Sequence, residues 1–130
     1  MQKPRRIITI VLAKTFTSSM DVQRMLNDVF DSPEIRLVED NVPGNIGDAD
    51  LLILDEGLRA VSGSGHALAL QTSGSFTGPT IVVLENSDAI FSIDYLQRAH
   101  RHKNIRIWNP HEFGSRQTLK KILEELGMFS

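Results

Sequence analysis

Asp50-Leu51-Leu52-Ile53-Leu54-Asp55-Glu56-Gly57 is the stretch that decides the fold. Four aliphatic residues run without a break between two aspartates, and a glycine then ends the run. A short continuous apolar run bounded by polar and turn residues is typical of a strand that is covered on both faces. Asp55 follows at the carboxyl end of this strand, and ligands of open α/β sheets bind at that edge. The stretch therefore predicts a buried parallel strand with an aspartate at the functional edge of a sheet.

Four further apolar segments predict the remaining strands, because they are rich in β-branched and aliphatic residues. They are residues 7–13, 35–38, 80–84 and 105–108. Helical patterns alternate with the strands, and the strands are apolar on both faces. This combination indicates an α/β fold, a parallel sheet wound on both sides with right-handed crossovers.

Apolar residues at helical spacing follow Ser18, Ser87 and Ser115, and each serine is predicted to cap its helix. Gly127 is predicted to end the last helix. Residues 40–45 (Asp-Asn-Val-Pro-Gly-Asn) are typical of a turn instead. The second crossover helix is therefore expected to be shortened or absent.

The composition is that of one compact domain, with 130 residues of which 41% are hydrophobic. A net charge of −2 gives no global attraction to nucleic acid or to anionic membranes. The absence of cysteine excludes disulfides and thiolate metal sites. The apolar run after the basic N-terminus is too short to cross a membrane. We therefore expect a single cytoplasmic domain over residues 1–130.

The order of elements, with a lone aspartate after the third strand, resembles the receiver domain of two-component response regulators. The resemblance covers nearly the whole chain and implies a flavodoxin/CheY-like sheet with strand order 2-1-3-4-5. It makes Asp55 the equivalent of the phosphoacceptor. After the aspartate, Leu58 fills the family's hydrophobic position, Arg59 replaces its proline, and Gly63 lies about where its glycine belongs.

The remaining active-site positions that the resemblance implies carry different residues. Receivers hold Mg²⁺ with an acidic pair after the first strand, because a carboxylate attacks a phosphoryl group poorly without a divalent cation. They also have a hydroxyl residue after the fourth strand and a lysine before proline after the fifth. This chain has Ala13 and Lys14, then Glu85, and then Asn109 before Pro110 at these places.

These changes predict a degenerate receiver, or pseudo-receiver, that is not an enzyme and needs no cofactor. Lys14 is hypothesised to bridge Asp55 and Glu85, in place of a metal ion. Signalling would then depend on binding a protein, either a second copy of the chain or an effector, including a C-terminal effector domain if the native chain continues past Ser130. The resemblance implies an interaction surface on the last helix and its neighbours. Its residues are Tyr95, Arg98, Arg106, Lys120 and Lys121.

Two alternatives remain open. In the first, Asp55 is phosphorylated with the help of Mg²⁺, which an unusual set of ligands holds. In the second, the loop that contains Gly57, Gly63 and Gly65 binds a small ligand or nucleotide. Direct nucleic-acid binding is not expected, because no aromatic residues are interleaved with the basic residues 98–106. No protein metal site is expected either, since His100 and His102 diverge on a helix.

Overall fold

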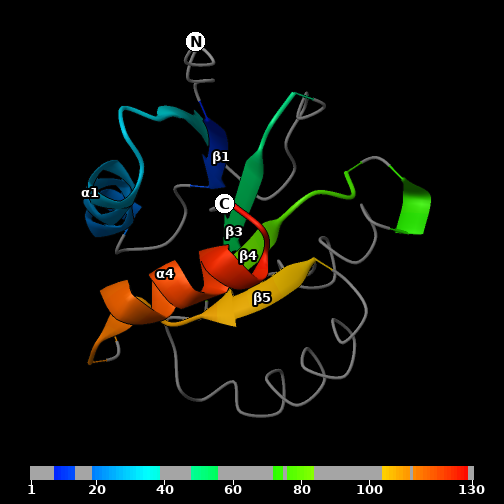
Figure 1. Cartoon of the computed structure of the whole chain (residues 1–130). Coiled ribbons are helices and arrows are strands. Elements are labelled where there is room, and N and C mark those ends of the chain that lie inside the picture. Colours follow the sequence, from blue (N-terminus) through cyan, green and yellow to red (C-terminus); the bar gives the residue numbers. More distant parts are fainter. Residues whose placement is uncertain are drawn as a thin grey trace, which may run out of the picture.

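The computed structural model describes residues 8–13, 19–38, 48–55, 72–74, 76–83, 104–111 and 113–128, and only the backbone of Ala13, Ser19 and Asp55. These residues form a five-stranded parallel sheet in the order β2-β1-β3-β4-β5 (Figure 1). The predicted α/β fold and strand order are confirmed. The strands are β1 Thr9–Ala13, β2 Glu34–Val38, β3 Leu51–Asp55, β4 Thr80–Val83 and β5 Ile105–Trp108.

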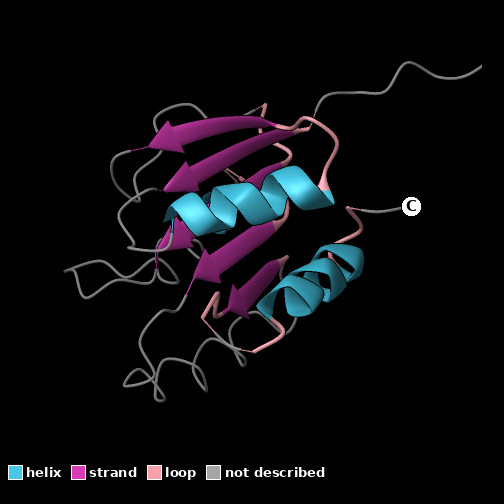
Figure 2. Cartoon of the chain, turned by 90° about the vertical axis from the view of Figure 1, so that its left-hand side faces the viewer, coloured by secondary structure: helices cyan, strands magenta, loops and turns pink. Residues whose placement is uncertain are grey.

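Two helices lie on the same face of the sheet, α1 (Ser19–Val29) and α4 (Ser115–Glu125), as Figure 2 shows. Each helix buries one apolar stripe. The stripe contains the side chains of Val22 and Leu26 in α1, and those of Leu119 and Leu123 in α4. These side chains belong to one core cluster with alternate residues of the strands, since successive strand residues point to opposite faces.

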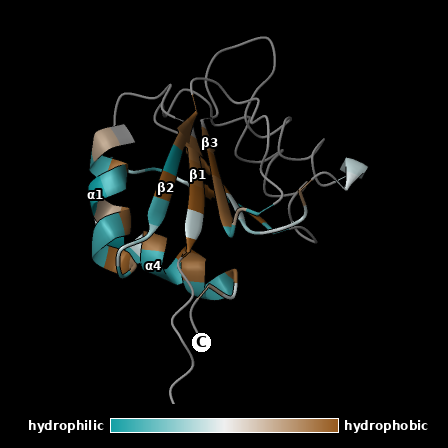
Figure 3. Ribbon diagram, turned by 90° about the horizontal axis from the view of Figure 1, so that it is seen from above, coloured by the Kyte–Doolittle hydropathy of each residue, from teal (hydrophilic) through white to brown (hydrophobic). Residues whose placement is uncertain are grey.

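The central strand is buried on both faces, as its sequence predicts. Leu51 and Ile53 belong to the cluster under the two helices, whereas Leu52 and Leu54 belong to a second cluster on the opposite face. All four have no exposed surface. Edge strand β2 differs, since much of it is hydrophilic (Figure 3) and Leu37 is 43% exposed. The hydrophobic run of β3 therefore reflects its central place in the sheet.

The C-terminal end of α4 is a Schellman motif, which confirms the predicted role of Gly127. Gly127 has φ 76°, a left-handed conformation that glycine adopts without a steric cost. Its N–H donates to the carbonyl of Glu124 (3.0 Å), and the N–H of Met128 donates to the carbonyl of Leu123 (2.9 Å). Met128 also packs against the core cluster, so the motif joins the helix end to the core.

The N-terminal end of α4 differs from the prediction. Gly114, with φ 77°, is the N-cap residue, and no side chain caps the helix. Ser115 is instead the first helical residue, and it is buried. Its carbonyl accepts a hydrogen bond from Nε1 of the Trp108 side chain (2.9 Å). The contact with β5 thus places the serine inside the helix, and the expected serine cap is wrong.

Several predicted elements lie outside the described residues. They are the cap at Ser18, the turn at 40–45 in place of a crossover helix, and the helix after Ser87. Among the helices that the structure describes, none has the length and apolar character needed to span a membrane.

Candidate functional site: the carboxyl edge of the sheet

All five strands are parallel, so their carboxyl ends meet at one edge of the sheet. Asp55 is the last residue of β3, and the strand register pairs it with Val83, the last residue of β4. Val83 in turn pairs with Trp108, the last residue of β5. Three neighbouring strands therefore end level with one another.

The end of β5 is the part of this edge where the residues that follow the strand are described. Trp108 is 1% exposed and belongs to the core cluster under the helices, so it is a packing residue. Asn109 follows, and its Oδ1 accepts a hydrogen bond from the backbone N–H of His111 (2.9 Å). This is an Asx turn, in which the side chain stabilises its own loop. Pro110 is buried.

The other predicted site residues lie largely outside the described part of the chain. Ala13 ends β1, and its backbone pairs with Val38. Lys14 and Glu85 are not among the described residues, and neither is the side chain of Asp55. The hypothesised bridge between these three side chains therefore stays a prediction. Among the described residues, no group of three or more histidine or acidic side chains is arranged to hold a metal ion.

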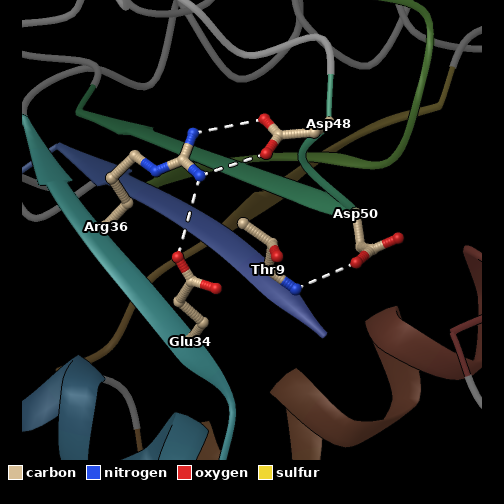
Figure 4. Close-up of polar contacts among 5 residues, drawn as sticks. All are labelled: Thr9, Glu34, Arg36, Asp48 and Asp50. Atoms are coloured by element: carbon tan, nitrogen blue, oxygen red, sulfur yellow. Dashed lines mark hydrogen bonds and ion pairs between the residues drawn. The ribbon is translucent and has the colours of Figure 1, made fainter. Parts of the chain in front are cut away.

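The opposite, amino edge of the sheet contains a contact that sequence reasoning missed. Oδ2 of Asp50 accepts a hydrogen bond from the backbone N–H of Thr9 (2.9 Å), the first residue of β1 (Figure 4). The backbone N–H of Asp50 donates to the carbonyl of Thr9 (2.8 Å). Asp50 thus binds both backbone groups of Thr9 and fixes the register of the two central strands. The signal in the sequence is an aspartate directly before a buried strand.

A second contact near this edge joins β2 to the residues before β3 (Figure 4). The guanidinium of Arg36 donates to both carboxylate oxygens of Asp48, at 3.2 and 3.1 Å, and lies 3.7 Å from Oε1 of Glu34. These hydrogen bonds lower the pKa of the Asp48 carboxyl below its usual value, and the Asp48 carboxylate raises the pKa of Arg36. All three side chains are more than one-third exposed. We interpret the group as an anchor that holds Asp48, shortly before β3, to β2.

The predicted interaction surface is described in part. Nε of Arg106 lies 3.4 Å from Oε2 of Glu125, which links β5 to α4, and Lys120 and Lys121 are exposed. Tyr95 and Arg98 lie outside the described residues. Sequence reasoning missed a further feature of this region: Phe113, between β5 and α4, is fully exposed, at 108% of its reference area.

No protein-family model matches this sequence, and no curated protein matches it at a significant level. Solved structures with a similar fold are nevertheless found. The bacteriophytochrome response regulator RtBRR has a TM-score of 0.69 and 17% identity over 96% of this chain and 81% of its own. A response regulator receiver domain protein from Clostridium thermocellum has a TM-score of 0.68 and 12% identity over 92% and 94%. The Mn²⁺-bound form of the response regulator Rcp1 has a TM-score of 0.61 and 16% identity over 95% and 97%.

These similarities define the class of fold. The chain has the fold of response-regulator receiver domains, and the match extends over about nine-tenths of its length. The expected resemblance is confirmed at the level of the fold. The sequence identities are only 12–17%, and a shared fold does not imply a shared function. The chemistry of the site is therefore argued from its own residues.

Proposed function

We propose that residues 1–130 form one degenerate receiver domain, which signals by binding protein and does not depend on Mg²⁺-assisted phosphorylation. Its partner is an effector protein or a second copy of the chain. Two features support this proposal: the receiver fold, and the replacement of the groups that would activate an aspartate at the carboxyl edge of the sheet.

The observation that carries the proposal is the end of β5. The resemblance implies a lysine there, whose ammonium would contact a phosphoryl group bound at Asp55. Asn109 occupies this position and accepts a hydrogen bond from the N–H of His111. An amide has no positive charge to offer to a phosphoryl oxygen, and the oxygen of this one is engaged within its own turn. The end of β5 is thus suited to holding its loop and poorly suited to sensing phosphate.

The sequence after β1 and β4 supports the same proposal. Lys14 follows the end of β1, where receivers have metal-binding acids, and Glu85 lies two residues beyond the end of β4. A cation at the first position disfavours Mg²⁺, and an anion at the second repels a phosphoryl group. An ammonium group of Lys14 between the carboxylates of Asp55 and Glu85 would pair with both of them and leave one net negative charge, without any metal ion. Lys14→Ala would then leave two facing carboxylates and lower the melting temperature, whereas an unchanged melting temperature would count against the bridge.

Phosphoryl transfer is the direct test. The protein is incubated with Mg²⁺ and a small acyl phosphate donor, and intact mass spectrometry detects any added phosphoryl group. We expect no labelling of the native chain. A variant in which the family's groups are restored should gain labelling, and it should lose this labelling when Asp55→Asn is added. The restoring substitutions are Ala13→Asp, Lys14→Asp, Glu85→Thr and Asn109→Lys.

The same experiment tests the alternative, a receiver that is phosphorylated on Asp55. The observation in its favour is that Asp55 ends the central strand of the sheet, next to the end of β4 and level with the end of β5. Mg²⁺-dependent labelling of the native chain that disappears in Asp55→Asn would establish this alternative. Binding of a beryllofluoride analogue gives an independent measurement, because it needs the same metal shell.

Sedimentation of the native chain distinguishes the two kinds of partner. A monomer–dimer equilibrium at micromolar concentration would make a second copy the partner. A monomer at all accessible concentrations would leave an effector protein as the partner.

A further inference from the structure

Strand β2 forms one edge of the sheet, and in the described sheet its single neighbour is β1 (Figure 3). The Glu34 side chain at its start is 59% exposed, and Leu37 near its end is 43% exposed. An exposed edge strand presents a row of backbone donors and acceptors that can pair with another chain. The outer side of β2 is therefore the part of the sheet that is best placed to add a strand.

The backbone groups on this outer side can be assigned to residues. The N–H of Glu34 donates to the carbonyl of Ile8, directly before β1 (2.8 Å). Because the backbone groups of successive strand residues point to opposite sides, those of Ile35 and Leu37 point away from β1. No described residue is hydrogen-bonded to these outward groups. A strand that pairs with β2 must therefore meet Ile35 and Leu37.

The two charged side chains of β2 lie on one face of the sheet. Ile35 packs against the core cluster under the helices, so its neighbours Glu34 and Arg36 lie on the opposite face, where Figure 4 shows them together with Asp48. The Arg36 side chain is 37% exposed. A guanidinium has five N–H donors, so Arg36 can bind a further carboxylate beside Asp48. One face of β2 thus presents an anion and a cation two positions apart.

This spacing makes β2 complementary to an antiparallel copy of itself. Such a pair of identical strands is two-fold symmetric, and only three registers bring the outward residues together. If Ile35 faces Ile35 of the second copy, Glu34 of each copy faces Arg36 of the other. If Ile35 faces Leu37, the two Arg36 side chains oppose each other, which is destabilising. If Leu37 faces Leu37, Arg36 faces the apolar Val38. Charge complementarity therefore favours the first register.

We propose that β2 is a self-association edge, on which a second copy of the chain adds its own β2 in antiparallel orientation with Ile35 facing Ile35. The two Ile35 residues exchange backbone hydrogen bonds, which supply affinity. The two Glu34–Arg36 pairs lie at the positions between hydrogen-bonded residues, where facing side chains are closest, and they set the register. One continuous sheet then runs through the dimer.

This inference rests on the part of the proposed function that has the domain bind protein, and it names the second copy as that partner. Phosphoryl labelling tests the state of Asp55, whereas self-association tests the β2 edge. A chain that is neither labelled nor dimeric would keep the proposed function, with an effector as partner, and would lose this inference. The two can therefore fail separately.

Sedimentation equilibrium of two charge variants tests the register. Glu34→Arg places cations opposite each other in both pairs, and Arg36→Glu does the same with anions. Each variant alone should dimerise at least about tenfold more weakly than the native chain. An equimolar mixture has opposite charges in both pairs again, so its dissociation constant should return to within about threefold of the native value. Arg24→Glu on α1 is the matched control and should change the constant by less than about twofold.

Single cysteines give an independent measurement of the register, because the chain contains none. Ile35→Cys places the two Cα atoms about 5.5 Å apart in the proposed dimer, within the range of a disulfide, whereas Leu37→Cys leaves them more than about 13 Å apart. Mild oxidation should therefore cross-link Ile35→Cys faster, although Leu37 is the more exposed residue.

Four results would overturn the proposal. They are a native chain that is monomeric at all accessible concentrations, a dimer that the charge variants do not weaken, a mixture of variants with native circular dichroism that stays monomeric, and faster cross-linking of Leu37→Cys than of Ile35→Cys. If a charge variant does not fold, the cross-linking comparison decides on its own.

Discussion

Asp50→Ala should destabilise the protein by removing the side-chain acceptor of the Thr9 N–H. The bond is 2.9 Å long, partly buried, and its acceptor is an ionised carboxylate. A hydrogen bond to a charged group contributes about 1.5–3 kcal/mol, and partial exposure favours the lower half of that range. We expect a loss of about 2 kcal/mol, counting this bond alone. With a urea m-value of about 2 kcal/mol/M, the unfolding midpoint should fall by about 1 M.

Urea unfolding followed by circular dichroism measures this loss, and two variants make it specific. Asp50→Asn keeps a carbonyl acceptor without the charge, and it should lose about half as much, because charge-assisted bonds are about twice as strong as neutral ones. Glu124→Ala removes an exposed acid of α4 and should change stability by less than about 0.5 kcal/mol. Equal losses for Asp50→Ala and Asp50→Asn, or a loss below about 0.5 kcal/mol for the alanine variant, would refute this account of the amino edge.

Three further predictions follow from described contacts. Arg36 holds the pKa of Asp48 below its usual value, so the stability that this pair contributes is fully present above that usual value and is lost as the pH falls toward the lower pKa of the folded state. The difference in urea midpoint between the native chain and Asp48→Asn should therefore be constant above about pH 5 and shrink on acidification. A constant difference down to pH 2 would contradict this. A Cβ at Gly78 would lie 3.0 Å from Cζ of Phe76, so Gly78→Ala should lower the free energy of unfolding by about 1–3 kcal/mol, measured by thermal unfolding. Adding Phe76→Leu to the same chain should recover part of this loss. Additive losses of the two substitutions would argue against the clash. Gly127→Ala, at φ 76°, should lower the free energy of unfolding by about 1 kcal/mol through backbone strain alone, since open space surrounds this position. An unchanged helicity and stability of this variant would contradict that reason.

Most of the fold could be predicted from the sequence because the buried strands have a strong local signal. The runs around Ile10, Ile53 and Ile81 are apolar at consecutive positions, which identifies central strands of a parallel sheet. The left-handed position after α4 was equally predictable, since Gly127 follows the last apolar residue of the helix. The cap at Ser115 was not, because a tertiary contact with Trp108 decides where the helix begins.

The contacts at and near the amino edge were less accessible to sequence reasoning, because they join residues far apart in the chain. The bonds from Thr9 to Asp50 and from Arg36 to Asp48 span 41 and 12 residues. No local pattern specifies such partners. Exposure is equally hard to infer for one residue, and no pattern in the sequence indicates that Phe113 is exposed.

The two aspartates at the ends of β3 show that an acid at a strand end can have a structural role instead of a catalytic one. Asp50 accepts a hydrogen bond from a backbone N–H of the neighbouring strand, so its position is explained without any ligand. An acid at a strand end is therefore compatible with a structural role, and Asp55 needs more than its place in the fold to be a nucleophile. The residues next in sequence bear on these roles: with Lys14 after β1 and Glu85 after β4, we predict a charge-paired carboxylate and not a metal-activated one. Restoring the family's groups around Asp55 is thus the decisive comparison, because it changes the chemistry of the edge while β3 keeps the aspartate in the same place.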